Sequence, residues 1–394
     1  MIQLGNERLF GDDFHLIKGR RVGLVTNPSG VNSALQSTAD RLCAAGGVEL
    51  TALFGPEHGI RGDLEDGVRL GPATDARTGV TVFSLYGETR RPLDHMLENV
   101  DVLVVDIQEV GVRFYTYLYT MSMAMEACAE RSLPVVVLDR PNPIGGELVE
   151  GNILDPEFAS FVGMYPIAVR HGMTIGELAR LFSSVHDIDV ELHVVELRGW
   201  DRDQYWDETG LPWVAPSPNM PTVDTAVVYP GMCFFEGTNI SEGRGTTKPF
   251  EQIGSPYIDG DALAGVLNDL NLPGAAFRPV FFRPSFGKYA GESCRGIQVH
   301  VLDRSVFRAV SVGFGILAAV RGMYPGAFEW RVPNRGIHNF DKLAGTDRVR
   351  RAIDAGTSAA DLERDWARDR RLFMEQRQSC LLYPQAAAID TNRA

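Results

Sequence analysis

Short hydrophobic runs recur along the first half of the chain, and each ends in a loop rich in Gly, Pro and polar residues. The runs cover residues 21–25, 48–54, 80–85, 100–105 and 134–138. Apolar and polar positions do not alternate within them, as expected for strands buried on both faces of a parallel sheet. Helix-like stretches lie between the runs, notably at residues 115–131. This alternation predicts an α/β fold with a Rossmann-like, doubly wound and mostly parallel sheet.

The chain after about residue 170 follows a different pattern. Thr174 and Glu177 form a capping box that predicts the start of a helix. Further elements are predicted as strands at residues 191–197, 277–282 and 296–302, and as helices at residues 305–323 and 359–378. A chain of 394 residues is too long for one compact core. We therefore expect a Rossmann-like domain over residues 1–235 that carries the catalytic loops, and a smaller C-terminal α+β domain over residues 236–394 that closes the cleft.

Composition narrows the function classes. The chain is 44% hydrophobic and 23% charged, as in ordinary soluble proteins, and its 38 basic and 51 acidic residues give a net charge of −13. No basic patch offsets that charge, so we expect no nucleic-acid partner. The first residues lack the features of a signal peptide, and no apolar stretch is long enough to span a membrane, so we expect a cytoplasmic protein. Five widely spaced cysteines predict neither disulfides nor a zinc site.

Polar side chains gather where the predicted strands end. The carboxyl ends of parallel strands open on one edge of a sheet, where ligands bind. That edge would collect Asn27, Glu57, His58, Glu88, Asp106, Gln108, Glu109, Asp139, Arg140 and Asn142. A single strand-end aspartate such as Asp106 or Asp139 often only braces a loop. The crowding of so many polar residues on one edge is what predicts a site.

Motifs that would indicate other chemistries are incomplete. The GxGxxA pattern at residues 313–318 lies inside a helical pattern with no strand before it, so it predicts helix packing and no dinucleotide site. Residues 243–248 lack the first glycine of a phosphate loop, and neither HExxH nor GxSxG occurs. We therefore predict no metal and no cofactor.

Carboxylate chemistry remains. Glu57, with Glu109, Glu236 and Glu242 as further acids, suits general acid–base catalysis such as glycoside cleavage. Side chains that could bind hydroxyl groups, anionic groups or a sugar face are Asn27, Gln108, Asn142, Asn219, Asn239, Arg113, Arg140, Arg244, Lys248, Phe114, Tyr115 and Tyr117. Each polar residue among these also has a structural interpretation as a hydrogen-bonding residue that braces a loop.

Several long motifs resemble one family. They are Phe-Gly-Pro-Glu-His-Gly-Ile-Arg-Gly at residues 54–62, Asp-Ile-Gln-Glu-Val-Gly-Val-Arg-Phe-Tyr-Thr-Tyr at 106–117 and Leu-Asp-Arg-Pro-Asn-Pro at 138–143, together with residues 171–178, 216–222 and 236–251. These motifs resemble the NamZ-like exo-β-N-acetylmuramidases of glycoside hydrolase family 171. The similarity runs from about residue 21 to residue 383.

The resemblance implies hydrolysis of the β-1,4 bond that releases N-acetylmuramic acid from the non-reducing ends of peptidoglycan fragments, at a cleft between two domains. It places the catalytic glutamate on Glu57, which would act as general acid with His58 tuning or relaying its proton. Arg113, Arg140 or Arg244 would bind the lactyl carboxylate. Glu109, Glu242 or the substrate's acetamido group could be the second catalytic group. Many relatives look exported, and the oligomeric state is left open. The alternative function is a non-catalytic binder of muropeptides or anionic sugars.

Overall fold

A seven-stranded sheet organises the first half of the chain in the computed structural model, which describes residues 2–62, 73–332 and 336–384. The strand order is β3-β4-β2-β1-β5-β6-β9, and every neighbouring pair is parallel except β3 with β4. The strands are β1 (Arg21–Thr26), β2 (Glu49–Gly55), β3 (Ala73–Thr74), β4 (Thr81–Ser84), β5 (Val102–Asp106), β6 (Val135–Leu138) and β9 (Leu192–Val195). The predicted doubly wound, mostly parallel α/β sheet is confirmed.

Both faces of this sheet are covered. Val102 and Val104 of β5 point into one core, whereas Leu103 and Val105 point into the other. The helices that supply these cores are α1 (Gly5–Leu9) and α2 (Thr38–Ala44) on one face, and α4 (Tyr117–Ala129) and α5 (Ile175–Val185) on the other. A short helix, α3 (Asp94–Leu97), precedes β5. Burial on both faces explains why the hydrophobic runs do not alternate.

A three-stranded antiparallel sheet, with strand order β10-β12-β11, forms the second lobe. Its elements are α6 (Val223–Met232), β10 (Gln252–Ser255), α7 (Gly260–Asp269), β11 (Ala275–Phe282), β12 (Cys294–Val301), α8 (Ala309–Met323), α9 (Asn339–Ala344) and α10 (Arg348–Asp354). We call residues 2–222 the sheet lobe and α6 to α10 the C-terminal lobe. The predicted domain boundary lies between residues 235 and 236, so it would assign α6 to the first domain. In the structure α6 packs against α8 of the C-terminal lobe.

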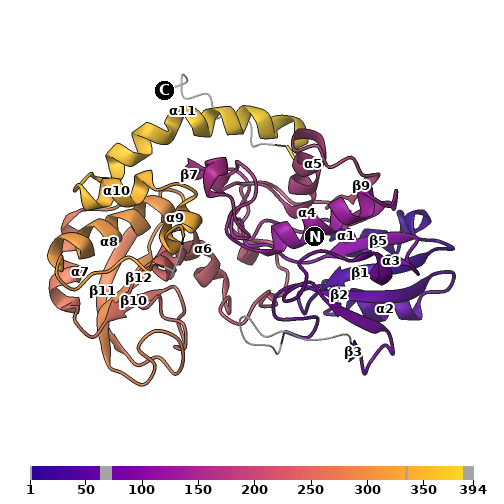
Figure 1. The fold of residues 1–394 in the computed structure, drawn as a ribbon, viewed down its shortest axis with the longest axis horizontal. Helices are drawn as coiled ribbons and strands as arrows, with labels where there is room; N and C mark the ends of the chain where they lie inside the picture. The colour runs from indigo at the N-terminus through magenta and orange to yellow at the C-terminus, as the bar shows by residue number, and fades with distance from the viewer. Residues whose placement is uncertain (1, 63–72, 333–335, 385–394) are drawn as a thin grey trace.

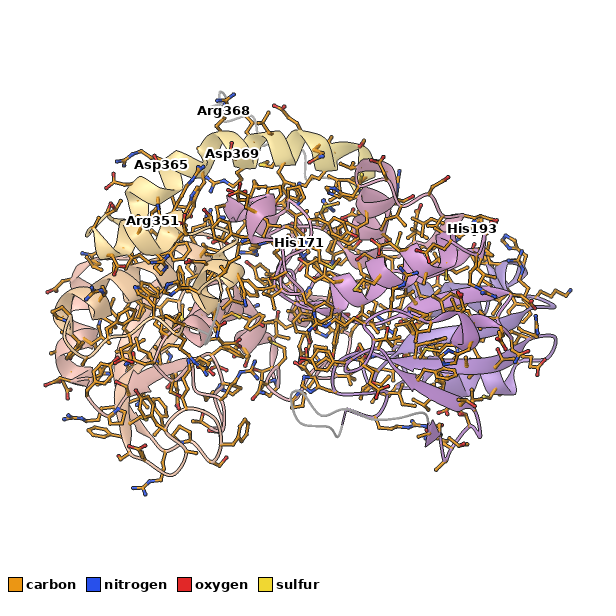
Figure 2. The ribbon with its side chains drawn as sticks, in the orientation of Figure 1. His171, His193, Arg351, Asp365, Arg368 and Asp369 are labelled. Carbon is orange, nitrogen blue, oxygen red and sulfur yellow. The ribbon has the colours of Figure 1, made fainter. Side chains whose placement is uncertain are left out.

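The last helix returns to the sheet lobe. α11 (Ala359–Arg377) runs from the C-terminal lobe across the top of the molecule towards α5 in Figure 1. It packs on β7 (Glu150–Ile153), which pairs with β8 (Ala168–Arg170) beside the main sheet. Figure 2 shows Arg368 on the outer side of this helix. α11 therefore belongs to the packing of both lobes.

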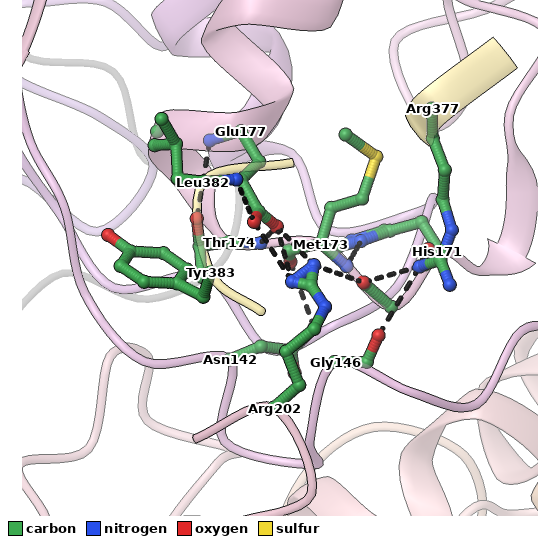
Figure 3. Close-up of polar contacts among 12 residues, drawn as sticks. Asn142, Gly146, His171, Met173, Thr174, Glu177, Arg202, Arg377, Leu382 and Tyr383 are labelled. Carbon is green, nitrogen blue, oxygen red and sulfur yellow. Dashed lines mark hydrogen bonds and ion pairs between the residues drawn. The ribbon is translucent and has the colours of Figure 1, made fainter. Parts of the chain in front are cut away.

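A buried polar cluster anchors the end of α11 (Figure 3). Arg377 is fully buried and donates to the carbonyl oxygens of His171, at 3.0 Å, and Gly172. Beside it, Glu177 forms the predicted capping box with Thr174 and also accepts three hydrogen bonds from Arg202, at 2.9, 3.0 and 2.7 Å. Glu177 therefore caps α5 and braces this cluster.

The GxGxxA pattern lies inside α8, as predicted, where it allows close packing against α6. A Cβ atom on Gly313 would lie 2.3 Å from the carbonyl oxygen of Gly231. No helix in the described part of the chain combines the length and the hydrophobicity needed to cross a bilayer.

Candidate active site

A pocket of about 460 Å³ opens where the two lobes meet. The sheet lobe lines it with Glu57, His58, Tyr86, Arg90, Phe114, Tyr115, Thr116, Tyr117, Ser160, Phe161, Val162, Ser217, Asn219 and Met220. The C-terminal lobe lines it with Tyr229, Cys233, Glu236, Arg244, Phe250, Lys342 and Leu343. Polar groups among many aromatic side chains are typical of a site that binds a sugar-sized molecule.

Glu57 reaches this pocket because β2 ends in a tight turn. The turn closes through a hydrogen bond from the backbone N–H of Gly59 to the carbonyl oxygen of Pro56, at 2.9 Å. His58 and Gly59 both adopt left-handed conformations, with φ of 71° and 74°. Glycine accepts that conformation readily, whereas His58 holds it at an energetic cost, as residues at functional sites often do.

The first residues of α4 hold the Glu57 side chain and backbone. The Thr116 hydroxyl donates to Glu57 Oε2 at 3.0 Å. The Tyr117 hydroxyl lies 3.2 Å from the Glu57 carbonyl oxygen and 2.6 Å from the carbonyl oxygen of Pro216. These contacts fasten the Glu57 loop to the loop that contributes Ser217 and Asn219.

Tyrosines form much of the pocket wall and are held neutral. Burial raises the pKa of Tyr115 well above its usual value, and the neighbouring Tyr117 adds to the effect. Burial likewise raises the pKa of Tyr229 well above its usual value. Both phenols therefore stay protonated in any physiological range, so their rings offer uncharged surfaces to a sugar.

The C-terminal lobe brings a second carboxylate, Glu236, to the pocket. Glu236 lies on the 3₁₀ helix Cys233–Gly237, and Arg244 binds its Oε1 atom at 2.7 Å. The Arg244 guanidinium also lies 3.6 Å from Glu242 Oε1 and 5.2 Å from the ring centroid of Phe250. Arg244 thus reaches the pocket as predicted, with two carboxylates around it.

A second pocket of about 600 Å³ adjoins the first and shares Val162, Glu236, Arg244, Lys342 and Leu343 with it. Glu242 lines only this second pocket, where Lys288 Nζ binds its Oε2 atom at 2.8 Å. The sequence therefore placed Glu242 in the right region, but it is not among the residues that surround Glu57.

Two cationic residues of the site were not predicted. Arg90 lines the first pocket with its guanidinium 4.0 Å from the ring centroid of Phe161, and Lys342 lines both pockets from α9. Both residues lie in polar surface segments with no motif around them. Neither spacing nor composition distinguished them from solvated side chains.

The structure does not place Glu109 in the pocket. Its side chain is 1% exposed. Glu109 accepts a hydrogen bond from the backbone N–H of Gly111 and lies 3.4 Å from Nε2 of His171, which is buried as well. The expectation that Glu109 is catalytic is therefore not supported, because a group enclosed this deeply has no path to a substrate in the pocket.

Arg113 and Arg140 are also structural. Arg113 is fully buried and donates to four carbonyl oxygens, two of them on Leu343 and Ala344 at the end of α9. Burial lowers the pKa of Arg113 to about 10. Arg140 pairs with the buried Asp106 at 2.6 Å. Neither guanidinium lines the pocket, so of the three arginines predicted to bind the lactyl carboxylate the structure supports only Arg244 as a residue of the pocket.

The predicted amide residues divide in the same way. Asn219 lines the pocket, whereas Asn27, Gln108, Asn142 and Asn239 bind backbone carbonyl oxygens elsewhere. Lys248 binds Glu251 at 2.9 Å, outside the residues that line the pocket. No group of three or more His, Cys, Asp or Glu residues among the described residues is arranged to hold a metal ion.

Two family models match the chain almost from end to end. The model described as "Exo-beta-N-acetylmuramidase NamZ, N-terminal" matches residues 22–224, and its C-terminal counterpart matches residues 227–383. A curated relative, the peptidoglycan beta-N-acetylmuramidase NamZ of Bacillus subtilis (strain 168), is 50% identical over 382 residues, which cover 97% of this chain and 91% of the relative.

Two crystal structures share the fold, both of DUF1343 family proteins from Bacteroides fragilis NCTC 9343. The first is 38% identical with a TM-score of 0.90, and the match covers 97% of this chain and 99% of that chain. The second is 30% identical with a TM-score of 0.78, and the match covers 98% of this chain and all of that chain, 100%.

Proposed function

The chain belongs to the exo-beta-N-acetylmuramidase NamZ family, and on that premise we propose that it is the glycosidase that releases N-acetylmuramic acid from the non-reducing ends of peptidoglycan fragments. The observation that carries the proposal is the position of Glu57, which lines an aromatic and cationic pocket between the lobes. A carboxyl group beside a sugar-sized cavity is the arrangement that glycoside cleavage requires.

In this proposal Glu57 is the general acid. Its loop is fixed by the turn at Gly59 and by the hydroxyls of Thr116 and Tyr117, so its carboxyl group holds one position beside the substrate. From there it donates a proton to the glycosidic oxygen as the bond breaks. His58 lines the same pocket, and in this proposal it tunes or relays that proton.

Glu236 is the second carboxylate that supports a two-carboxylate mechanism, since it lines the pocket from the opposite lobe and Arg244 fixes its orientation. The acetamido group of the substrate is the alternative second group, because substrate-assisted enzymes use it in place of a carboxylate.

The test is the release of free N-acetylmuramic acid from a disaccharide that carries it at the non-reducing end. We expect release by the wild-type protein, and a fall of about 10²- to 10⁴-fold in the Glu57→Gln variant. The activity of Glu236→Gln should fall to a similar extent if Glu236 is the second catalytic group. If the acetamido group of the substrate has that role, Glu236→Gln should retain most of the wild-type activity. Glu98→Gln makes the same change at an exposed position and should match the wild type.

Two results would contradict the proposal. A wild-type protein that binds the disaccharide without releasing N-acetylmuramic acid is a muropeptide-binding protein. A folded Glu57→Gln variant that keeps most of the wild-type rate would remove Glu57 from the mechanism.

A further inference from the structure

The second pocket is lined by more cationic than acidic side chains. Arg244 and Lys342 line both pockets, and Lys288 and Arg331 line the second. Glu236 and Glu242 are the acidic residues that line the second pocket. In a protein with a net charge of −13, this local excess of positive charge favours an anionic group at the junction.

Two of these cations already have partners. Arg244 lies against Glu236 and Glu242, and Lys288 donates to Glu242 and to the carbonyl oxygens of Phe235 and Ile240. Lys342 and Arg331 differ, because within residues 2–62, 73–332 and 336–384 neither side chain has a carboxylate partner. Arg331 is exposed and lines only the second pocket, whereas Lys342 is half-buried at the wall that the two pockets share.

The position of Lys342 is fixed by its helix. Lys342 lies in the last turn of α9, and the two residues that follow, Leu343 and Ala344, bind Arg113 through their carbonyl oxygens at 3.2 and 2.8 Å. Arg113 extends from the loop after β5, so it ties α9 to the sheet lobe that carries Glu57. The backbone at Lys342 is therefore held relative to the first pocket.

We propose that Lys342 binds the carboxylate of the 3-O-lactyl substituent and is the residue that selects N-acetylmuramic acid over N-acetylglucosamine. The inference rests on the proposed function, since the sugar occupies the first pocket with its glycosidic oxygen at Glu57. The lactyl group then points to the shared wall, where Lys342 supplies an ammonium group for a charge-assisted hydrogen bond.

The test uses two chromogenic substrates: the β-glycoside of N-acetylmuramic acid and the same glycoside with the lactyl carboxylate converted to a methyl ester. The wild type should prefer the acid by about 10- to 100-fold in kcat/KM, the range for a hydrogen bond between charged groups. Lys342→Met should lose most of that preference and hydrolyse the ester at the wild-type rate. Lys342→Arg should retain a preference, and Lys18→Met, at an exposed position before β1, should behave as the wild type.

The outcomes separate the inference from the proposed function. A wild type that hydrolyses acid and ester equally well overturns the role of Lys342 and leaves the hydrolase intact. A wild type that hydrolyses neither substrate overturns both. A structural role for Lys342 at the negative end of α9 predicts that Lys342→Met lowers the rates on both substrates equally, and that result also overturns the inference.

Discussion

The hydroxyl group of Thr116 is the side-chain contact that orients the Glu57 carboxyl group, at 3.0 Å. Thr116→Val keeps the shape of the side chain and removes this hydrogen bond, so the carboxyl group should sample positions away from the glycosidic oxygen. We expect kcat to fall roughly 10- to 100-fold with little change in KM, because small displacements of catalytic groups have effects of this size. Steady-state kinetics on the chromogenic muramic acid glycoside measures both parameters.

Thr116→Ser is the matched control, since it restores a hydroxyl at the same atom. A positioning role predicts that this variant recovers most of the lost kcat. If Thr116→Ser is as slow as Thr116→Val, the methyl group and its packing matter, and the hydrogen bond to Glu57 does not position the acid.

Single residues also show what the sequence could and could not reveal about the site. Glu57 and His58 were predicted to lie at the site because they follow the end of a strand, at the edge of the sheet where many other polar residues gather. Glu109 and Arg140 satisfy the same pattern, yet both are buried and bind protein groups. The difference lies in tertiary contacts, such as the pairing of Arg140 with Asp106, that residue type and spacing do not encode.

Among the elements, the crossing of α6 and α8 controls the position of Glu236, because the 3₁₀ helix that carries Glu236 continues directly from α6. Gly313→Ala would place a Cβ atom 2.3 Å from the carbonyl oxygen of Gly231, and a rigid backbone atom cannot move aside cheaply. We expect the free energy of unfolding to fall by about 2–4 kcal/mol. Urea denaturation followed by circular dichroism measures the change.

Gly322 provides a control on the same helix. A Cβ atom added there meets nothing within 4 Å, and the position is exposed. Gly322→Ala should therefore stabilise the protein by about 0.5–1 kcal/mol through helix propensity alone. Equal effects of the two substitutions would mean that the close approach of α6 and α8 does not limit the side chain at residue 313.

Strands of the main sheet were the elements that the sequence predicted best. Their hydrophobic runs are continuous, and β-branched residues dominate them, so each is recognisable without its neighbours. By contrast, β10 has the sequence Gln-Ile-Gly-Ser, and α6 contains Pro230 and Gly231. These elements form because β12 and α8 pack against them, and local propensity alone favours a turn in both places.

At the scale of the whole molecule, the site depends on residues more than 200 positions apart in the chain. Lys342 and Glu57 line one pocket because α9 of the second lobe docks on the sheet lobe through Arg113. The sequence predicted two lobes and a cleft, through the family resemblance, but the residues that the second lobe contributes beyond Glu236 and Arg244 depend on this docking.

Residues 378–384, which follow α11, also dock on the sheet lobe and bring a pH-sensitive contact to the end of β6. The Tyr383 hydroxyl donates to Asp139, which also accepts hydrogen bonds from Thr174 Oγ1 and the backbone N–H of Gly176, both at 2.8 Å. Burial raises the pKa of Asp139 from 3.8 to about 7, and the charge of Glu177 adds to the effect. Between these values the folded protein holds a proton that the unfolded chain has lost.

The contribution of Asp139 to stability is therefore largest below about pH 4, and it declines as the pH rises towards about 7. Asp139→Asn keeps the shape and stays neutral, so the unfolding free energy of the wild type minus that of the variant should decrease from pH 5 to pH 8 by on the order of 2–4 kcal/mol. Urea denaturation of both proteins at pH 5, 6, 7 and 8 gives this difference directly, because titrations elsewhere in the chain cancel. If the difference in unfolding free energy stays constant from pH 5 to pH 8, the hydrogen-bond donors around Asp139 outweigh the effect of its burial. Asp139 would then be ionised throughout this range, and it would bind Tyr383 as an ordinary charged acceptor.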